Sequence, residues 1–270
     1  MIPAPIRYHR AASVDDALAA LAEQDASALA GGQSLLPVMK IRLARPALVV
    51  DIGRLELAGL EVADSALRIG ALTTWDTLAR ASELSLPALA AISECAAGIG
   101  DLQVRNRGTI GGSLAHADPA SDMPAVLLAL GAEVEIRSAA TSRSLPLAEL
   151  FLGPFTTAVE QGELIMAVTV PKPPDGAGSA YEAVEHPASG FALAGAAALA
   201  LPDRSSRIAV TGIAATPFVL DDATDPTAAL AGVDVFGDRF APAEYRRDLA
   251  ATVLRRALEK ARARSEAARQ

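Results

Sequence analysis

The spacing of apolar residues predicts alternating helix and strand near the N-terminus. Ser13 and Asp16 have the spacing of a capping box, and apolar residues follow them at helical intervals, so a helix is expected over 14–23. Short apolar runs at 28–30 and 48–52 are bounded by Gly or Pro, which is typical of buried strands. We therefore expect a glycine-rich loop, Gly31–Ser34, between these two strands.

The same alternation continues toward the middle of the chain. Strands are expected at 67–69, 132–137 and 164–170, where apolar residues alternate or form short runs. Asp122 has the position of an N-cap, with proline two residues later, and Gly131 has the position of the residue that ends this helix. Between the first two strands, helical spacing is seen at Leu78, Leu89, Ile92, Cys95, Ala96 and Ile99.

The C-terminal third differs in pattern, with longer apolar runs and one long helix. Strands are expected near 179–185, 191–201 and 207–215. The segment 171–178 before them is rich in Pro and Gly and is the most linker-like in the chain, so we place a boundary between domains 1–174 and 175–270. The fold class is α+β. The last helix is expected to bury one face that carries Tyr245, Leu249, Val253, Leu254 and Leu258.

Composition narrows the class of function. The chain has 270 residues, 51% of them hydrophobic and 21% charged, which indicates a globular protein. A formal charge of -8 disfavours nucleic acid as a partner. The longest apolar run, 191–201, is too short to span a membrane, and the N-terminus lacks a secretory pattern, so we expect a cytoplasmic protein. The charge pairs Asp221-Asp222 and Arg246-Arg247 are expected to be solvated surface.

The residue types that usually carry catalysis or bind metal are sparse. One cysteine, Cys95, cannot form an internal disulfide and cannot supply the four thiolates of an iron–sulfur cluster, so any such cluster must belong to a partner. The three histidines lack the spacing of a metal site, and His116 is expected to support a neighbouring loop. We find no nucleophile and no acid–base pair, and therefore assign no catalytic and no metal-binding residue.

Two glycine-rich turns are the candidate binding elements. They are Ala30–Leu35 and Gly108–Ser113, and each combines a glycine pair with a hydroxyl side chain. Such turns let backbone N–H groups converge on an anion, although glycine is also common in ordinary tight turns. Neither turn has the spacing of a Walker A motif or of a Rossmann dinucleotide site. A ligand with a pyrophosphate held between two loops, such as FAD, is compatible with them.

These turns and their flanks resemble the FAD-binding medium subunits of molybdenum hydroxylases, the carbon monoxide dehydrogenase and xanthine dehydrogenase type. The first block is Ala30–Lys40 and the second is Gln103–Asp122. Weaker similarity extends through Phe151–Thr157, Tyr181 and Ala243–Arg247, so the resemblance covers nearly the whole chain. It departs from the family at Ala183 and at Glu185-His186-Pro187, where relatives often have basic residues.

The resemblance implies a fold and a cofactor site. The expected fold is a two-part α/β region that binds FAD, followed by a smaller α+β domain with an antiparallel sheet. Arg105 and Arg107 could offset phosphate charge, or could be ordinary exposed loop residues. Residues implied to contact FAD are Ala30, Gly31, Gly32, Gln33, Ser34, Leu35, Leu36, Gly100, Thr109, Ile110, Gly111, Gly112, Ser113, Asp122 and Leu164.

The resemblance also implies a function and partners. The chain would relay electrons from an iron–sulfur small subunit through FAD to an external acceptor, with substrate oxidised on a molybdopterin large subunit, in a heterotrimer or its dimer. Two alternatives stay open from the residues alone. One is a self-contained flavin-dependent oxidase, which would need its own substrate pocket with a base. The other is a nucleotide-binding module that has lost its flavin.

Overall fold

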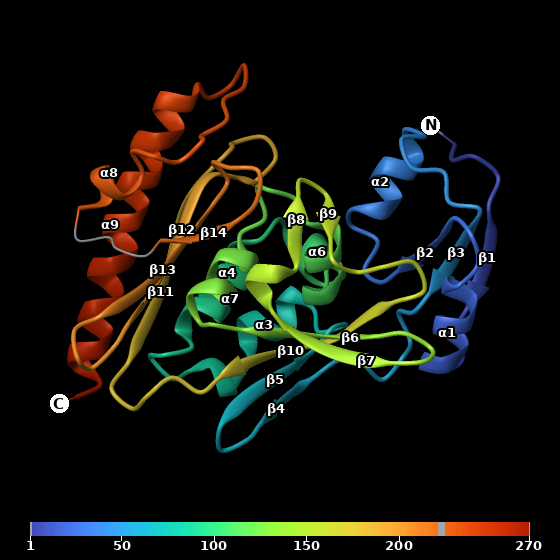
Figure 1. Ribbon diagram of the computed structural model, residues 1–270, viewed down its shortest axis with the longest axis horizontal. Coiled ribbons are helices and arrows are strands. Elements are labelled where there is room, and N and C mark those ends of the chain that lie inside the picture. The colour runs from blue at the N-terminus through green and yellow to red at the C-terminus, as the bar shows by residue number, and fades with distance from the viewer. Residues whose placement is uncertain (1, 221–224, 270) are drawn as a thin grey trace.

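The strands form three sheets and one small hairpin within residues 2–220 and 225–269, which the computed structural model describes (Figure 1). Asp221 and Asp222 lie outside these residues. No helix in the described ranges combines the length and the apolar character that a membrane crossing requires.

The first unit is a parallel sheet in the order β1-β3-β2. As predicted, Ser13 caps α1 by accepting a hydrogen bond from the backbone N–H of Asp16. The Asp16 carboxylate, however, accepts from the N–H of Ala12 at 2.8 Å, one residue before the donor that a capping box would use. The elements are β1 (Arg7–Arg10), α1 (Val14–Leu21), β2 (Ala26–Leu29), α2 (Leu35–Lys40) and β3 (Leu48–Asp51).

The second unit is an antiparallel sheet in the order β4-β5-β10-β6-β7. Its strands are β4 (Leu60–Val62), β5 (Ala66–Gly70), β6 (Glu133–Arg137), β7 (Ser142–Pro146) and β10 (Leu164–Pro171). The strands predicted around 67–69, 132–137 and 164–170 are therefore confirmed. The helices are α3 (Trp75–Arg80), α4 (Ala90–Gly98), α5 (Leu102–Arg105), α6 (Ile110–His116) and α7 (Met123–Ala129), with short turns η1 (Ser82–Leu84) and η2 (Leu147–Glu149) and the hairpin β8 (Phe151–Gly153) and β9 (Thr156–Thr157).

The helical spacing between Leu78 and Ile99 is divided between two α-helices. The interruption between α3 and α4 contains Pro87, which has no backbone N–H and disfavours helical backbone at the residue before it. Gly131 follows α7 with a φ of +70°, which confirms it as the residue that ends this helix.

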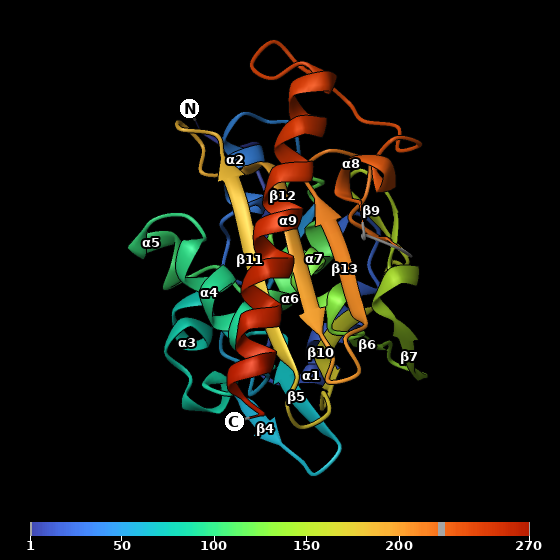
Figure 2. The same cartoon turned by 90° about the vertical axis from the view of Figure 1, so that its left-hand side faces the viewer.

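The third unit is an antiparallel sheet in the order β11-β12-β13-β14, as the resemblance implied. Helix α9 covers its outer face and α4 and α7 lie against the inner face (Figure 2). Most residues of β12 are buried alanines. Their small side chains let helices pack closely against both faces of the sheet. The elements are β11 (Gly178–Glu185), β12 (Ala192–Ala200), β13 (Ser206–Thr211), β14 (Phe218–Leu220), α8 (Pro226–Ala229) and α9 (Ala243–Ala267).

The start of α9 differs from the sequence prediction. Tyr245 is half exposed and does not belong to the buried face, whereas Arg246 is only 4% exposed. Arg246 donates to the carbonyl oxygens of Leu193 (2.9 Å) and Gly212 (2.8 Å) and pairs with Asp238 at 2.7 Å. The prediction that this arginine is solvated is wrong, because the loop before α9 folds back over the beginning of the helix.

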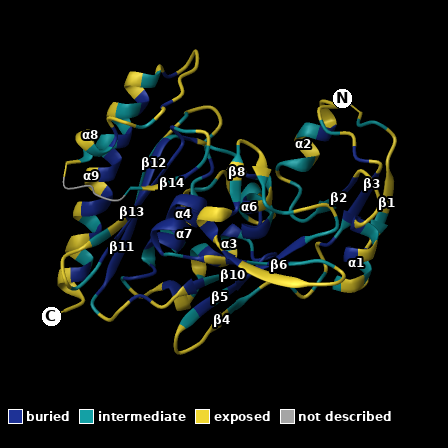
Figure 3. Cartoon of the chain, in the orientation of Figure 1, coloured by how far each residue is buried: buried dark blue, intermediate teal, exposed yellow. Residues whose placement is uncertain are grey.

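One core joins the second and third units. Ile92 of α4 and Val126 of α7 belong to the same buried cluster as Ala197 and Leu199 of β12. In Figure 3 these two helices are dark blue between the sheets. Helices α4 and α7 are therefore packed between the sheets of the second and third units.

Candidate functional site

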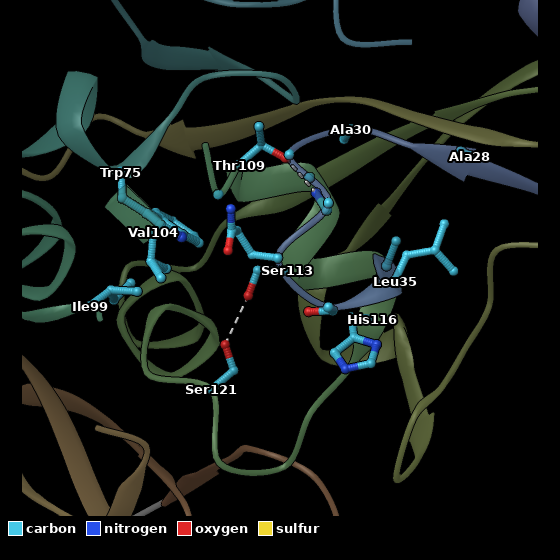
Figure 4. Close-up of a pocket in the computed structure, with 18 of the residues that line it drawn as sticks. Ala28, Ala30, Leu35, Trp75, Ile99, Val104, Thr109, Ser113, His116 and Ser121 are labelled. Atoms are coloured by element: carbon cyan, nitrogen blue, oxygen red, sulfur yellow. Dashed lines mark hydrogen bonds between the residues drawn. The ribbon is translucent and has the colours of Figure 1, made fainter. Parts of the chain in front are cut away.

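A cavity of about 610 Å³ is lined by residues of all three units. The loop after β2, the segment from the end of α4 to the start of α7, and the tip of the β11–β12 hairpin all contribute to it. Figure 4 shows Trp75, Ile99 and Val104 on one side of the cavity and Leu35 and His116 on the other. The hydroxyls of Ser113 and Ser121 are hydrogen-bonded at 2.9 Å across the turn between them.

The first glycine loop presents a run of free backbone donors. Among the described residues, none accepts a hydrogen bond from the N–H groups of the five consecutive residues 31–35. Gly32 has a φ of +75°, a conformation that side chains other than glycine rarely adopt. Unpaired N–H groups at such a turn form a concave site for an anion. The loop fits a phosphate group without any basic side chain.

The second glycine loop is different, because most of its own N–H groups are already bonded. Ile110 donates to the carbonyl oxygen of Thr73 at 3.0 Å, Gly111 donates to that of Ala71 at 2.8 Å, and Gly112 donates to Thr109 Oγ1 at 3.2 Å. A Cβ at Gly111 would lie 2.6 Å from the Cβ of Ala71. This loop therefore contributes a closely packed backbone surface, and the expectation that it too offers a nest of free donors is not met.

The two glycine loops touch each other. A Cβ on Gly31 would overlap the carbonyl group of Arg107 and would lie 3.0 Å from the Cα of Gly108. Glycine is therefore required at position 31 for contact with the other loop. The free donors of the first loop are thereby fixed relative to the second.

The structure brings most of the expected site residues together. The cavity is lined by Ala30, Gly31, Gly32, Gln33, Ser34, Leu35, Gly100, Thr109, Gly111, Gly112, Ser113, Asp122 and Leu164. Leu36 and Ile110 do not line it: Leu36 is 40% exposed on α2, and Ile110, the first residue of α6, is fully buried in the core. Lining residues that the sequence reasoning missed include Trp75, Val104 and Phe191, which lie outside the glycine motifs and look like ordinary core or loop positions.

Asp122 has the predicted N-cap position directly before α7, but its side chain does not cap the helix. Its Oδ1 instead accepts a hydrogen bond from the hydroxyl of Tyr181 on β11. Burial raises the pKa of Asp122 to about 6, against the Tyr181 hydrogen bond, which favours the ionised form. The carboxyl group is thus held inside the cavity wall with a single side-chain donor.

Of the two interpretations of Arg105 and Arg107, the structure favours ordinary loop residues over phosphate contacts. Arg105 donates to the carbonyl oxygens of Gly100 (2.7 Å) and Ile99 (3.3 Å), and neither Arg105 nor Arg107 lines the cavity. Among the described lining residues His116 is the single basic side chain, and it packs against Phe155 with ring centroids 5.2 Å apart. Backbone N–H groups and neutral polar side chains such as Ser34 are therefore the donors available to a phosphate here.

Comparison with known proteins identifies the family. The model for the FAD binding domain in molybdopterin dehydrogenase matches residues 4–173. The chain belongs to this family. The match includes both glycine loops and ends shortly before β11.

Relatives of this FAD-binding family align over almost the whole chain. The 6-hydroxypseudooxynicotine dehydrogenase complex subunit alpha of Paenarthrobacter nicotinovorans is 39% identical over 97% of this chain and 96% of its own. The carbon monoxide dehydrogenase medium chain of Afipia carboxidovorans is 37% identical over 98% and 100%. The structure of reconstituted CO dehydrogenase from Oligotropha carboxidovorans has a TM-score of 0.92 at 37% identity, covering 98% of this chain and 100% of that one. Quinoline 2-oxidoreductase from Pseudomonas putida 86 has a TM-score of 0.89 at 27% identity over the whole of both chains.

The chain is therefore an FAD-binding medium subunit of the molybdenum hydroxylases, with FAD as its cofactor and an α+β fold. The comparisons decide against a module that has lost its flavin. The cavity fits the cofactor, since the free N–H groups of the first loop match the charge of a diphosphate. Its relatives are subunits of multi-subunit oxidoreductases.

Proposed function

We propose that this chain relays electrons from the iron–sulfur clusters of a partner subunit, through FAD, to an external acceptor. The observation that carries the proposal is a cavity with free phosphate-binding donors in a chain that cannot house the clusters itself. Its one cysteine, Cys95, is buried on α4, where burial raises the pKa of the thiol. Bound FAD supplies the redox chemistry, since it exchanges electrons singly or in pairs.

The chain's own task is to hold this cofactor. In our proposal the N–H groups of Gly31–Leu35 bind the diphosphate, and the Thr109–Ser113 backbone packs against the cofactor from the other loop. Asp122, Gly100 and Leu164 line the remainder of the site. The apolar side chains of Trp75, Ile99 and Val104 exclude water from one side.

We propose two domains, 1–174 for FAD binding and 175–270 as a C-terminal domain. Support comes from the segment between β10 and β11, which joins the antiparallel sheets of the second and third units. The partners in this proposal are an iron–sulfur small subunit and a molybdopterin large subunit, in a heterotrimer or its dimer. Names such as "medium chain" among the relatives support a complex with further subunits.

Purification of the tagged chain from its native source tests the proposal. We expect co-purifying subunits with molybdenum and iron, and flavin that is reduced when the iron–sulfur clusters are reduced. Separation of the subunits should abolish this flavin reduction. A lone flavoprotein that oxidises an organic substrate by itself would overturn the relay and favour the oxidase.

A further inference from the structure

Tyr181 contacts the wall of the FAD cavity from behind. It lies on β11 and does not line the cavity, but its hydroxyl donates to Oδ1 of Asp122, which does. Among the described residues no other side chain donates to this carboxyl group. Asp122 is also the one carboxylate among the described lining residues. Tyr181 is thus the side chain that determines how this carboxylate is oriented.

The neighbouring strand leaves space for the Tyr181 hydroxyl. Position 195 on β12 is glycine within a run of alanines, and a Cβ there would overlap the hydroxyl oxygen and lie 3.1 Å from Cζ of Tyr181. The same Cβ would lie 3.0 Å from Cγ2 of Thr211. Glycine at position 195 therefore leaves the space that the Tyr181 hydroxyl occupies.

The Asp122 carboxylate does not cap α7, although Asp122 has the N-cap position of this helix. An N-cap aspartate ordinarily accepts a hydrogen bond from the first turn of its helix, but the side chain of Asp122 makes no such bond. The carboxylate is turned to Tyr181 instead. The Asp122 carboxylate can therefore still accept a hydrogen bond from a ligand in the cavity.

We propose that Tyr181 is a positioning residue for FAD, which holds the Asp122 carboxylate so that it accepts a hydrogen bond from a hydroxyl or N–H group of the cofactor. The proposal rests on FAD binding in this cavity. It assigns Tyr181 no contact with the cofactor, so its effect must act through Asp122.

The charged groups around Asp122 indicate how the ionisation of this carboxyl group, and hence its hydrogen bond with Tyr181, depends on pH. The titratable groups that face it are Tyr181 and Glu185 on β11, Asp118 in the loop before α7, and Cys95 on α4. None of them is cationic, and burial and the acidic neighbours raise the pKa of Asp122. The Tyr181 hydroxyl is the side-chain donor that favours ionisation, with a smaller contribution from the backbone of Asp122 itself, so loss of the hydroxyl should raise this pKa further.

Titration of the full chain with FAD, followed by flavin fluorescence between pH 5 and 8, tests the proposal. Tyr181→Phe should weaken FAD binding at pH 7 by about tenfold, the effect of one hydrogen bond to a charged group. The ionised carboxylate is the form that accepts from both partners, so wild-type affinity should fall as the pH drops through about 6. In Tyr181→Phe this fall should begin at higher pH, and in Asp122→Asn it should disappear.

A double variant separates positioning from simple loss of packing. In an Asp122→Ala background, adding Tyr181→Phe should change the affinity by less than about twofold, because the oxygen that accepts from the Tyr181 hydroxyl is gone. Gly195→Ala should reproduce the effect of Tyr181→Phe, and it replaces that variant if the latter fails to fold. Tyr245→Phe, at an exposed position on α9, is the matched control. His116, the other titratable lining residue, is unchanged in every variant, so differences between profiles report on Asp122.

The outcomes distinguish this inference from the proposed function. A wild-type chain that binds no FAD contradicts the proposed function before any variant is compared. Wild-type binding together with an unchanged affinity and pH profile in Tyr181→Phe and Gly195→Ala would overturn the positioning role alone. Equal weakening by Tyr181→Phe with and without Asp122→Ala would also overturn it, because the tyrosine would then act independently of the side chain at position 122.

Discussion

At the scale of single residues, glycine serves different purposes in the two loops of the site. Gly32 adopts a positive φ, whereas Gly31 and Gly111 are required because a Cβ would collide with another segment of backbone. The sequence shows the glycines but not these reasons, since the colliding atoms belong to Arg107 and Ala71. Local pattern could therefore predict that both loops line one cavity, but not which loop keeps more free donors.

Gly31→Ala should separate the two loops. The new methyl group would overlap the carbonyl of Arg107, so one loop must move and the free N–H groups of residues 31–35 lose their arrangement. We expect FAD affinity to fall by about tenfold or more, which corresponds to roughly 1.4 kcal/mol, in a titration followed by flavin fluorescence. Gly153→Ala is the control, since a Cβ there meets no atom within 4 Å. Equal affinity in both variants would contradict this account.

Asp122 should make the stability of the FAD-free chain depend on pH. Its pKa is about 6 in the folded chain against an ordinary value of 3.8, so the folded state binds the proton more tightly. The free energy of unfolding should therefore fall as the pH rises from about 4 to 6, by about 3 kcal/mol from this group. In urea unfolding at several pH values, the stability of the wild type relative to Asp122→Asn should show this decline. A parallel decline in both would exclude Asp122 as the source.

At the scale of helices and strands, periodicity predicted the elements well where burial alone determines them. The strands around Leu67, Val134 and Val168 are examples, since each is buried on the sheet. The prediction is wrong for Arg246, because its partners, Leu193 on β12 and Gly212 just after β13, are distant in the sequence and leave no trace in the local pattern. Contacts between distant segments, more than propensity, account for what the sequence could not show.

An ion-pair network joins α9 to the second unit. Arg264 binds both carboxylate oxygens of Glu94 on α4 and donates to the carbonyl of Ser179, and Lys260 lies 3.3 Å from Glu94 and 2.9 Å from Glu182. Burial opposes ionisation of Glu94, but Arg264 and Lys260 outweigh it and lower the pKa. The network therefore holds α9 against α4, whose C-terminal end precedes the cavity residues Ile99 and Gly100.

Arg264→Ala should destabilise the chain by about 1–3 kcal/mol at pH 7, because it leaves Glu94 partly buried with Lys260 as its remaining partner. A lowered pKa means that this stability is present above the ordinary pKa of 4.5 and is lost as the pH falls below it. The difference from wild type in urea unfolding should shrink accordingly in acid. Arg256→Ala, at an exposed position on the same helix, should cost much less. Similar losses in the two variants would contradict a specific role for the network.

At the scale of the whole molecule, the proposed domains share their core. Ala197 and Leu199 of β12 pack in one buried cluster with Ile92 and Val126 of the preceding region. The cavity likewise takes Phe191 from the third unit and the glycine loops from the others. The sequence predicts a boundary near residue 174, but the packing across this position depends on helices that contact both sheets and could not be predicted from a linker pattern.

This shared core leads us to expect that the chain unfolds as one cooperative unit. Its single tryptophan, Trp75, is buried beside the cavity and reports on the second unit, whereas far-UV circular dichroism includes α9 and the third sheet. Urea transitions followed by the two signals should coincide. FAD at about 100 times its Kd should raise the unfolding free energy by about 2.7 kcal/mol by both signals, because it binds the folded state only. If the circular dichroism of the third unit were lost before Trp75 became exposed, the two regions would be independent and the cofactor would stabilise only one of them.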